Sequence, residues 1–160
     1  MSQAVTTSPA AKSKTQSSDA LALLKADHAL VEDLFDKFEK AKTEKQKGTL
    51  AAEICTELTI HAQIEEEIFY PAVREAIGED DLMDEADVEH AGAKDLIAQI
   101  EASAPGEDHF DAKVTVLGEY IKHHVKEEES EMFPKVRKSD LDLKELGAEM
   151  GARKAELESE

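Results

Sequence analysis

Apolar residues recur along most of the chain at alternating steps of three and four residues, the spacing of a helix with one buried face. The first such segment starts near the helix-capping residues Ser18 and Asp19 and carries Leu21, Leu24 and Val31 on its apolar face. Three further segments follow, separated by short polar, Gly- or Pro-containing stretches. The pattern therefore predicts four long helices, at about residues 18–40, 43–77, 80–102 and 107–138.

Short connections between long helices favour an all-α, up-down-up-down four-helix bundle, because a short loop returns the chain antiparallel to itself. A fifth, shorter helix is expected at the C-terminal end, where an apolar edge is formed by Leu143, Leu146, Met150 and Leu157. It would lie across the end of the bundle or mediate association. We expect three regions along the chain: a disordered N-terminal tail (1–17), the bundle (18–139) and the C-terminal helix (140–160).

The second long helix contains a proline, and its periodicity can be followed on either side of it. Its inner face is expected to carry Leu58, His61, Glu65, Ile68 and Ala72 in turn. The proline, Pro71, removes one backbone hydrogen bond and should bend the helix. Pro134 should do the same in the fourth helix, and Gly78 should end the second.

Polar residues interrupt the apolar seams at repeated positions. The segment 61–74 matches 124–137, and each copy has His, then Glu four residues later, an aromatic–Pro step, and Val-Arg. Residues four apart in a helix share one face. A second motif, an acidic residue followed by His, also occurs twice, as Asp27-His28 and Glu89-His90. The chain therefore contains an internal repeat, and each copy is a pair of helices. The polar residues on the seams are His28, His61, Glu65, His90, His124 and Glu128.

A metal site explains these six residues best. An ionised Glu within an apolar seam is costly unless it is paired or metal-bound, and no Lys or Arg occupies the seam positions. Any single His could be an ordinary core histidine, but four at repeated spacings, two with Glu four residues later, indicate ligands. Four imidazoles and two carboxylates suit two cations. Iron, manganese or zinc would fit this donor set.

The order and spacing of these residues resemble those of the hemerythrin-like, His-His-Glu (HHE) cation-binding domains, over about residues 18–139. The resemblance implies a four-helix bundle that holds two non-haem iron ions, joined by carboxylate and by oxo or hydroxo bridges. It also implies roles for the six residues. The terminal ligands would be His28, His61, His90 and His124, and the bridges Glu65 and Glu128.

The sequence departs from the oxygen-carrying members of that family at two places. Lys94 stands where they have a second His on the third helix, and Glu128 follows its His by four residues where they have Asp at the fifth. One metal would then lack an imidazole. Glu32 and Tyr120 are candidates to fill the position or to contact a ligand. The remaining polar residues near the motifs are expected at the surface: His109, His123, Glu66, Glu67, Glu127, Glu129 and Glu131.

The composition of the chain limits the classes of binding partner and the cellular compartments that we expect. The formal net charge of -18 argues against binding to nucleic acid or to an anionic membrane surface. The single cysteine, Cys55, excludes an internal disulfide and suits a reducing compartment. No apolar run is long enough for a membrane span, and residues 1–17 lack the apolar stretch of a secretory signal. We expect a cytoplasmic protein, and the sequence leaves its oligomeric state open.

Three functions are compatible with such a centre. The first is a non-haem di-iron protein that binds or senses oxygen or a related small molecule such as nitric oxide. The second is a di-iron enzyme that consumes peroxide or nitric oxide, although no further catalytic motif is visible. The third is iron storage or delivery, including repair of iron–sulfur clusters. Residues 1–17 contain no cysteine, which disfavours cluster repair, because repair proteins of this family commonly carry an N-terminal cysteine-bearing segment.

Overall fold

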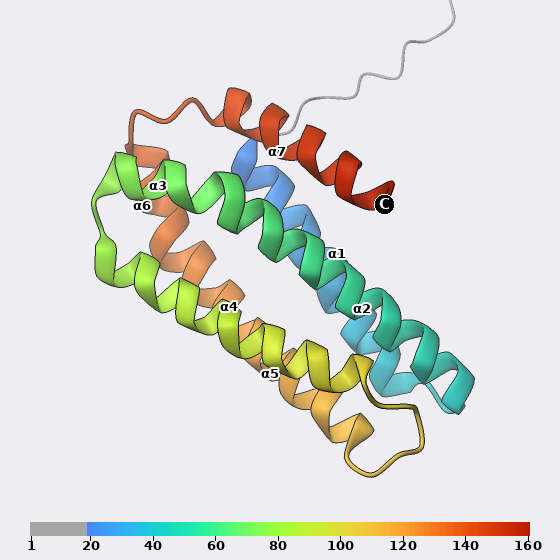
Figure 1. Ribbon diagram of the computed structural model, residues 1–160. Helices are drawn as coiled ribbons and strands as arrows, with labels where there is room; N and C mark the ends of the chain where they lie inside the picture. Colours follow the sequence, from blue (N-terminus) through green and yellow to red (C-terminus); the bar gives the residue numbers. More distant parts are fainter. Residues whose placement is uncertain (1–18) are drawn as a thin grey trace, which may run out of the picture.

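The protein forms a helical bundle closed at one end by an additional helix (Figure 1). The structure, a computed structural model, describes residues 19–160, so the tail expected at residues 1–17 lies outside the described residues. The elements in chain order are α1 (Ala20–Lys40), α2 (Glu44–Ile64), η1 (Glu65–Phe69), α3 (Tyr70–Ile77), α4 (Asp80–Glu101), α5 (Phe110–Glu127), η2 (Glu128–Met132), α6 (Phe133–Lys138) and α7 (Leu143–Glu158).

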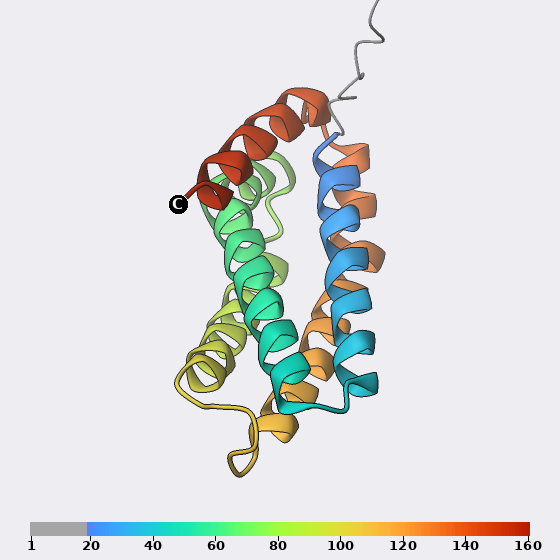
Figure 2. The ribbon, with the colours of Figure 1, turned by 90° about the vertical axis from the view of Figure 1, so that its right-hand side faces the viewer.

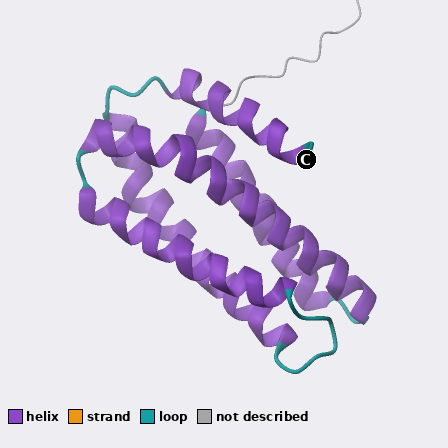
Figure 3. Cartoon of the chain, in the orientation of Figure 1, coloured by secondary structure: helices purple, strands orange, loops and turns teal. Residues whose placement is uncertain are grey.

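Four long helical rods make up the bundle: α1, α2 continued through η1 and α3, α4, and α5 continued through η2 and α6. Neighbouring rods run antiparallel, with α1 packed on α2 and α5, and α4 packed on the same two helices. The described chain is helix and loop throughout, as Figure 3 shows. This arrangement confirms the all-α, up-down-up-down four-helix bundle with a short additional C-terminal helix.

Local signals in the sequence account for the ends of the helices. The carboxylate of Asp19 accepts a hydrogen bond from the Ala22 amide at 2.8 Å and caps α1. The Thr43 hydroxyl accepts one from the Gln46 amide at 3.1 Å at the start of α2. Gly78 ends α3 with φ of 64°, a left-handed conformation that side chains with a Cβ rarely adopt. These caps set the short turns that return each rod antiparallel to the last.

A π-helical turn precedes each proline, and this feature was not expected from the sequence. The Tyr70 amide bonds to the Glu65 carbonyl, and the Phe133 amide to the Glu128 carbonyl, so each turn spans five residues instead of four. The added residue rotates the rest of each rod. The inner face of the second rod therefore passes to Phe69, Tyr70 and Val73, and the predicted positions Ile68 and Ala72 are only partly buried. The prediction failed because it assumed an unbroken α-helical period.

The apolar core has two parts, separated by a polar layer. The part at the capped end is built around Leu24, Phe69, Met83, Phe133 and Met150. The part near the opposite end contains, among others, Val31, Ile54, Ile97, Val114 and Leu117. The His and Glu side chains of the four rods lie between these two clusters, so packing on both sides holds them in place.

The helix α7 crosses the end of the bundle and packs on α1, α2 and η1, as the turned view shows (Figure 2). The sequence left open whether this helix lies across the end of the bundle or mediates association, and the structure shows the first arrangement. Among residues 19–160, no helix has both the length and the apolar character needed to cross a lipid bilayer.

Candidate metal centre

Six polar side chains from the four rods meet in the layer between the two cores. They are the residues singled out by the sequence repeat: His28 on α1, His61 on α2, Glu65 at the start of η1, His90 on α4, His124 on α5 and Glu128 at the start of η2. All six are buried, with exposed fractions of 9% or less. They form two groups of possible ligands, one of His28, His61 and Glu128, and one of Glu65, His90 and His124.

Each glutamate lies between imidazoles of the two groups. One oxygen of Glu65, Oε1, lies 3.0 Å from His61 Nε2 and 3.4 Å from His90 Nε2. The two oxygens of Glu128 diverge: Oε1 lies 3.4 Å from His28 Nε2 and Oε2 lies 3.1 Å from His124 Nε2. A carboxylate that faces an imidazole of each group is placed to bridge two cations, one in each group.

Several of these donor atoms lack hydrogen bonds, and this observation tests whether a metal would fit. Within the described part of the chain, His28 Nε2, His61 Nε2, both oxygens of Glu65 and Oε1 of Glu128 are buried without a hydrogen-bond partner. Unpaired polar atoms in a protein interior are costly and rare. These atoms come from different rods and converge on the same layer. Imidazole and carboxylate donors so arranged fit divalent or trivalent cations.

A carboxylate lies beside the Nδ1 atom of every one of the four imidazoles. The four pairs are His28 with Glu129 at 3.1 Å, His61 with Asp27 at 2.9 Å, His90 with Glu66 at 3.3 Å and His124 with Glu89 at 3.2 Å. A carboxylate at Nδ1 holds the proton on that nitrogen and leaves Nε2 available as a donor toward the two ligand groups. The same orientation therefore applies to all four rings.

Electrostatics in the centre favour a proton on His61 and on His124. Burial alone would lower the pKa of His61, but Glu65 and Asp27 raise it to about 10. Burial also opposes a charge on His124, whereas its bond to Glu128 raises the pKa to about 9. Burial would raise the pKa of Glu65, but His61 and His90 hold it well below its ordinary value. A metal cation would take the place of these protons.

Tyr70 is a central residue that the sequence analysis missed. Its hydroxyl donates to Glu128 Oε2 at 2.7 Å and lies 3.1 Å from His90 Nε2 and 3.3 Å from His124 Nε2. Burial, together with Glu128, raises the pKa of this phenol well above its ordinary value. The π turn of η1 brings Tyr70 to the inner face. The aromatic–Pro step of the repeat was the available signal, because it holds Tyr in one copy and Phe in the other.

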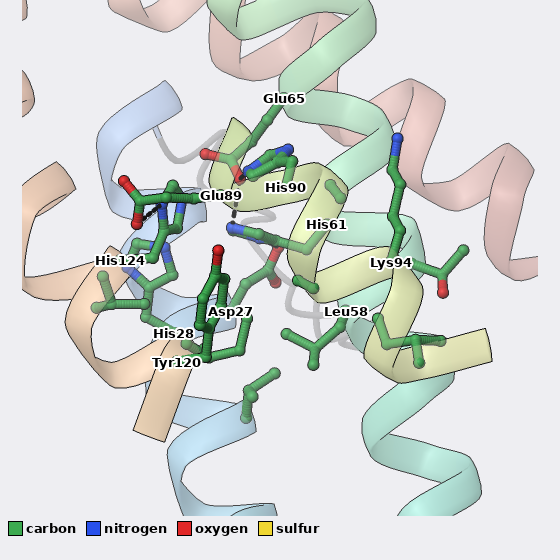
Figure 4. A pocket seen from close by; sticks show the side chains of 17 residues that line it. Asp27, His28, Leu58, His61, Glu65, Glu89, His90, Lys94, Tyr120 and His124 are labelled. Atoms are coloured by element: carbon green, nitrogen blue, oxygen red, sulfur yellow. Dashed lines mark hydrogen bonds and ion pairs between the residues drawn. The ribbon is translucent and has the colours of Figure 1, made fainter. Parts of the chain in front are cut away.

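The two candidates for the missing imidazole differ in their positions: Glu32 lies at the surface, and Tyr120 lies beside the imidazoles (Figure 4). Glu32 is exposed on α1, and Tyr120 lines the edge of a cavity beside the imidazoles, where its hydroxyl approaches the backbone at Gly92. Lys94 is directed away from the imidazoles (Figure 4) and pairs with Glu66. Glu32 belongs to neither of the two ligand groups, whereas a contact of Tyr120 with a bound ligand stays a prediction.

The surface residues are only partly as expected. His123 is exposed and pairs with Glu127 at 3.1 Å, and His109 is exposed at the start of α5, as predicted. Glu66 and Glu129, however, were expected in a solvated acidic face and instead contact His90 and His28. Side chains long enough to reach a neighbouring helix cannot be recognised from the period of their own helix.

A cavity of about 140 Å³ opens beside the imidazoles (Figure 4). All four imidazoles and Glu65 line its polar side. Most of the remaining wall is apolar and is formed by Val31, Leu58, Ala62, Ala93, Ile97, Ile121 and Val125. The cavity has room for a molecule of a few heavy atoms in contact with the candidate metal positions.

Related proteins share this fold and region. The family model described as hemerythrin HHE cation-binding domain matches residues 19–136. A crystal structure of a hemerythrin HHE cation-binding domain-containing protein from Mycobacterium kansasii superposes with a TM-score of 0.76 at 27% identity, and the match covers 89% of this chain and 88% of that one.

Two curated relatives extend the comparison. A protein of Mycobacterium tuberculosis described as uncharacterized is 28% identical over 143 residues, which is 87% of this chain and 87% of that protein. A protein of Nostoc named DNA nickase is 30% identical over 138 residues. This region is 85% of the present chain but only 39% of the Nostoc protein, so the match concerns a minor part of that relative.

Proposed function

Since the chain belongs to the hemerythrin HHE cation-binding domain family, we propose that its six buried His and Glu residues hold two iron ions. His28 and His61 would bind one ion, and His90 and His124 the other. Glu65 and Glu128 would bridge the two, because each faces an imidazole of both groups. The buried oxygens and nitrogens of these residues that lack hydrogen bonds support the proposal.

The function we propose is binding or sensing of oxygen or a related small molecule such as nitric oxide. The observation that carries this proposal is the cavity of about 140 Å³, which contacts all four imidazoles and is otherwise mostly apolar. Such a space suits small molecules with little charge, and it is too small for an ordinary organic substrate. When bound, iron would supply reversible electron donation to such a ligand.

Side chains around the cavity would position the bound small molecule and keep water out of the cavity. Val31, Ile97 and Val125 would exclude water from the ligand space. The Nδ1 contacts of the four imidazoles would keep every Nε2 directed inward. The Tyr70 hydroxyl, bonded to Glu128 at 2.7 Å, would hold a proton close to the imidazoles of His90 and His124.

A di-iron enzyme that consumes peroxide is a second candidate, and Lys94 favours it. The lysine occupies the position of an imidazole in oxygen carriers, but its ammonium pairs with Glu66 at the surface. The metal beside His90 would then have one imidazole fewer than in the carriers, which leaves a position for an exchangeable ligand or for Tyr70. A position of this kind favours reaction over reversible carriage.

The activity in the name of the Nostoc relative is not part of this proposal. The chain spans only 39% of that protein, and its net charge of -18 disfavours contacts with phosphates. We propose instead that this domain acts on a small molecule, without nucleic acid as a partner.

Elemental analysis and rapid mixing test the proposal. Protein purified without added metal should contain about two iron ions per chain, as expected for two ligand groups. The reduced protein should form a reversible adduct, seen by its absorption, when mixed with oxygen or nitric oxide. Turnover of peroxide without a stable adduct would favour the enzyme, and a reproducible single zinc ion would reject the two-iron centre.

A further inference from the structure

The helix α7 reaches the candidate metal centre through one lysine. Lys154 Nζ lies 2.5 Å from Asp27 Oδ1, and the other oxygen of this carboxylate, Oδ2, lies 2.9 Å from His61 Nδ1. His61 Nε2 in turn faces Glu65 at 3.0 Å. A continuous line of polar contacts thus runs from the C-terminal helix to the centre. The helix itself (Leu143–Glu158) lies beyond residues 19–136, where the family model matches.

The ion pair between Lys154 and Asp27 matters for stability because the Asp27 carboxylate is buried. The side chain of Asp27 is 7% exposed and that of Lys154 is 22% exposed. A carboxylate this deeply buried is stable only when opposite charge or hydrogen bonds satisfy both of its oxygens. His61 satisfies one oxygen and Lys154 the other. Without the lysine, the carboxylate would be free to turn away from His61 toward water.

Glu89, the counterpart of Asp27 in the second half of the bundle, gives an internal comparison. Asp27 bonds to His61 Nδ1, and Glu89 bonds to His124 Nδ1 in the same way. The two carboxylates are equivalent in the repeat, because each directly precedes the repeated His of its own helix. In the described part of the chain, no Lys or Arg pairs with Glu89, whose side chain is more exposed, at 18%. The imidazoles of His61 and His124 therefore differ in how firmly their carboxylates are held. His90 resembles His61 in this respect, because Lys94 pairs with Glu66 and Glu66 bonds to His90 Nδ1 at 3.3 Å.

We propose that Lys154 is a positioning residue for the metal centre. By anchoring Asp27, it fixes the ring of His61 with Nε2 toward the metal, so that α7 determines how tightly the ion at His28 and His61 is held. The inference rests on the metal-binding part of the proposed function. It adds a role for a helix outside the family region.

The neighbouring residue of α7 offers a matched control. Arg153 pairs with Glu67 at 2.8 Å, so it also joins α7 to the bundle through an ion pair. Glu67 bonds to Gln63 and contacts none of the four imidazoles. Arg153→Met thus removes a link of the same type from the same helix without touching the path to His61.

The experiment is a competition between a chelator and full-length protein loaded anaerobically with iron(II). In Lys154→Met, one of two bound ions should bind about 10- to 100-fold more weakly, the usual range when a ligand's supporting contact is lost. Lys154→Arg, which can also donate to Asp27, should bind both ions nearly as the wild type does. Arg153→Met should retain wild-type affinity, even if its melting temperature falls.

A double-mutant cycle separates positioning from general stability. In Asp27→Asn the lysine has no carboxylate to anchor, so adding Lys154→Met should weaken metal binding no further. In zinc-loaded protein, the nitrogen NMR signal of His61 Nδ1 should shift in Lys154→Met and stay in place in Arg153→Met. Additive losses, or equal effects of the two α7 variants, would overturn the positioning role.

The outcomes distinguish this inference from the proposed function. If wild-type protein binds two iron ions and Lys154→Met binds them equally well, only the inference fails. If the wild type takes up zinc but no iron, the iron function fails, and the same competition with zinc decides the role of Lys154. A wild-type protein that binds neither metal overturns both.

Discussion

Tyr70 and Phe133 occupy equivalent positions in the two halves of the bundle, but only Tyr70 carries a hydroxyl group into the metal centre. The Tyr70 hydroxyl donates to Glu128 at 2.7 Å, whereas the ring of Phe133 stacks on His28 with 6.2 Å between centroids. Each aromatic residue follows a π turn and precedes a proline. A polar contact on one side and an apolar one on the other break the symmetry of the centre.

Replacing Tyr70 by Phe should affect both stability and colour. In the metal-free protein, Tyr70→Phe removes the hydrogen bond that the phenol donates to the buried Glu128 carboxylate, so the free energy of unfolding should fall by about 1–3 kcal/mol. In the iron-loaded protein, the visible absorption should change, because the hydroxyl adjoins three of the proposed ligands. Urea unfolding and absorption spectra measure the two effects. Tyr120→Phe is the control, and an equal effect of both variants would contradict the central place of Tyr70.

Removing proposed ligands should remove metal. The variants His61→Ala, Glu65→Ala, His124→Ala and Glu128→Ala should each lower the metal content and reduce the rise in melting temperature that metal produces. The physical reason is that a ligand binding only the folded state stabilises it, by about 2.7 kcal/mol at one hundred times its dissociation constant. Metal analysis and thermal unfolding with and without added iron provide the measurement.

The two surface histidines are the controls for this series. His123 is 69% exposed and pairs with Glu127, and His109 precedes α5 at the surface. His123→Ala and His109→Ala should keep the metal content of the wild type. Loss of metal from His123→Ala with retention in His124→Ala would show that the helical phase of α5 is misassigned.

Filling the cavity should block the small molecule while sparing the metal. Ala93 lines the cavity but belongs to neither ligand group, so Ala93→Leu adds volume where space exists. The variant should retain its iron and form the oxygen or nitric oxide adduct at least about tenfold more slowly, a loss worth about 1.4 kcal/mol in the barrier. Stopped-flow absorption measures the rate. Ala86→Leu, in the opposite core cluster, should leave the rate unchanged.

Cys55 should be unreactive in the folded protein. Burial, and to a smaller extent Glu101, raise its pKa from 9.0 to about 11, and only the thiolate reacts with disulfide reagents. At pH 8 the folded protein should therefore react at least about 100-fold more slowly than the protein unfolded in guanidinium. Because the folded state retains the thiol proton longer, this group's contribution to stability is complete below pH 9 and declines between pH 9 and 11. Equal labelling of folded and unfolded protein at pH 8 would disprove this.

Periodicity in the sequence was sufficient to predict the rods and the six residues of the polar layer. A bundle helix separates its apolar and polar sides so regularly that His28 or Glu65, placed among apolar neighbours, stands out. Repetition of the pattern in each half then identified all six. The structure brings these residues together, and their role as ligands stays a prediction until metal is measured.

The remaining contacts depend on relations between helices. Whether Asp27 bonds to His61, or Glu66 to His90, depends on the rotation of one rod against the next, which neither rod's own sequence specifies. The same holds for Lys154, which lies 127 residues from its partner along the chain. Tyr70 was missed for a local reason, because its hydrogen-bonding turn is one residue longer than an α-helical turn.

Each π turn accommodates one residue more than an α-helical turn over the same stretch of its rod. Loss of one residue from 66–68 would therefore convert η1 to an α-helical turn and keep Tyr70 on the face of Glu65, because the Tyr70 amide would still bond to the Glu65 carbonyl. Closing the turn without the loss of a residue would instead rotate Tyr70 and the rest of the rod by about 100°. The hydroxyl would then leave the centre. The hydrogen-bond pattern of the turn, rather than the number of residues in it, thus keeps Tyr70 beside the imidazoles.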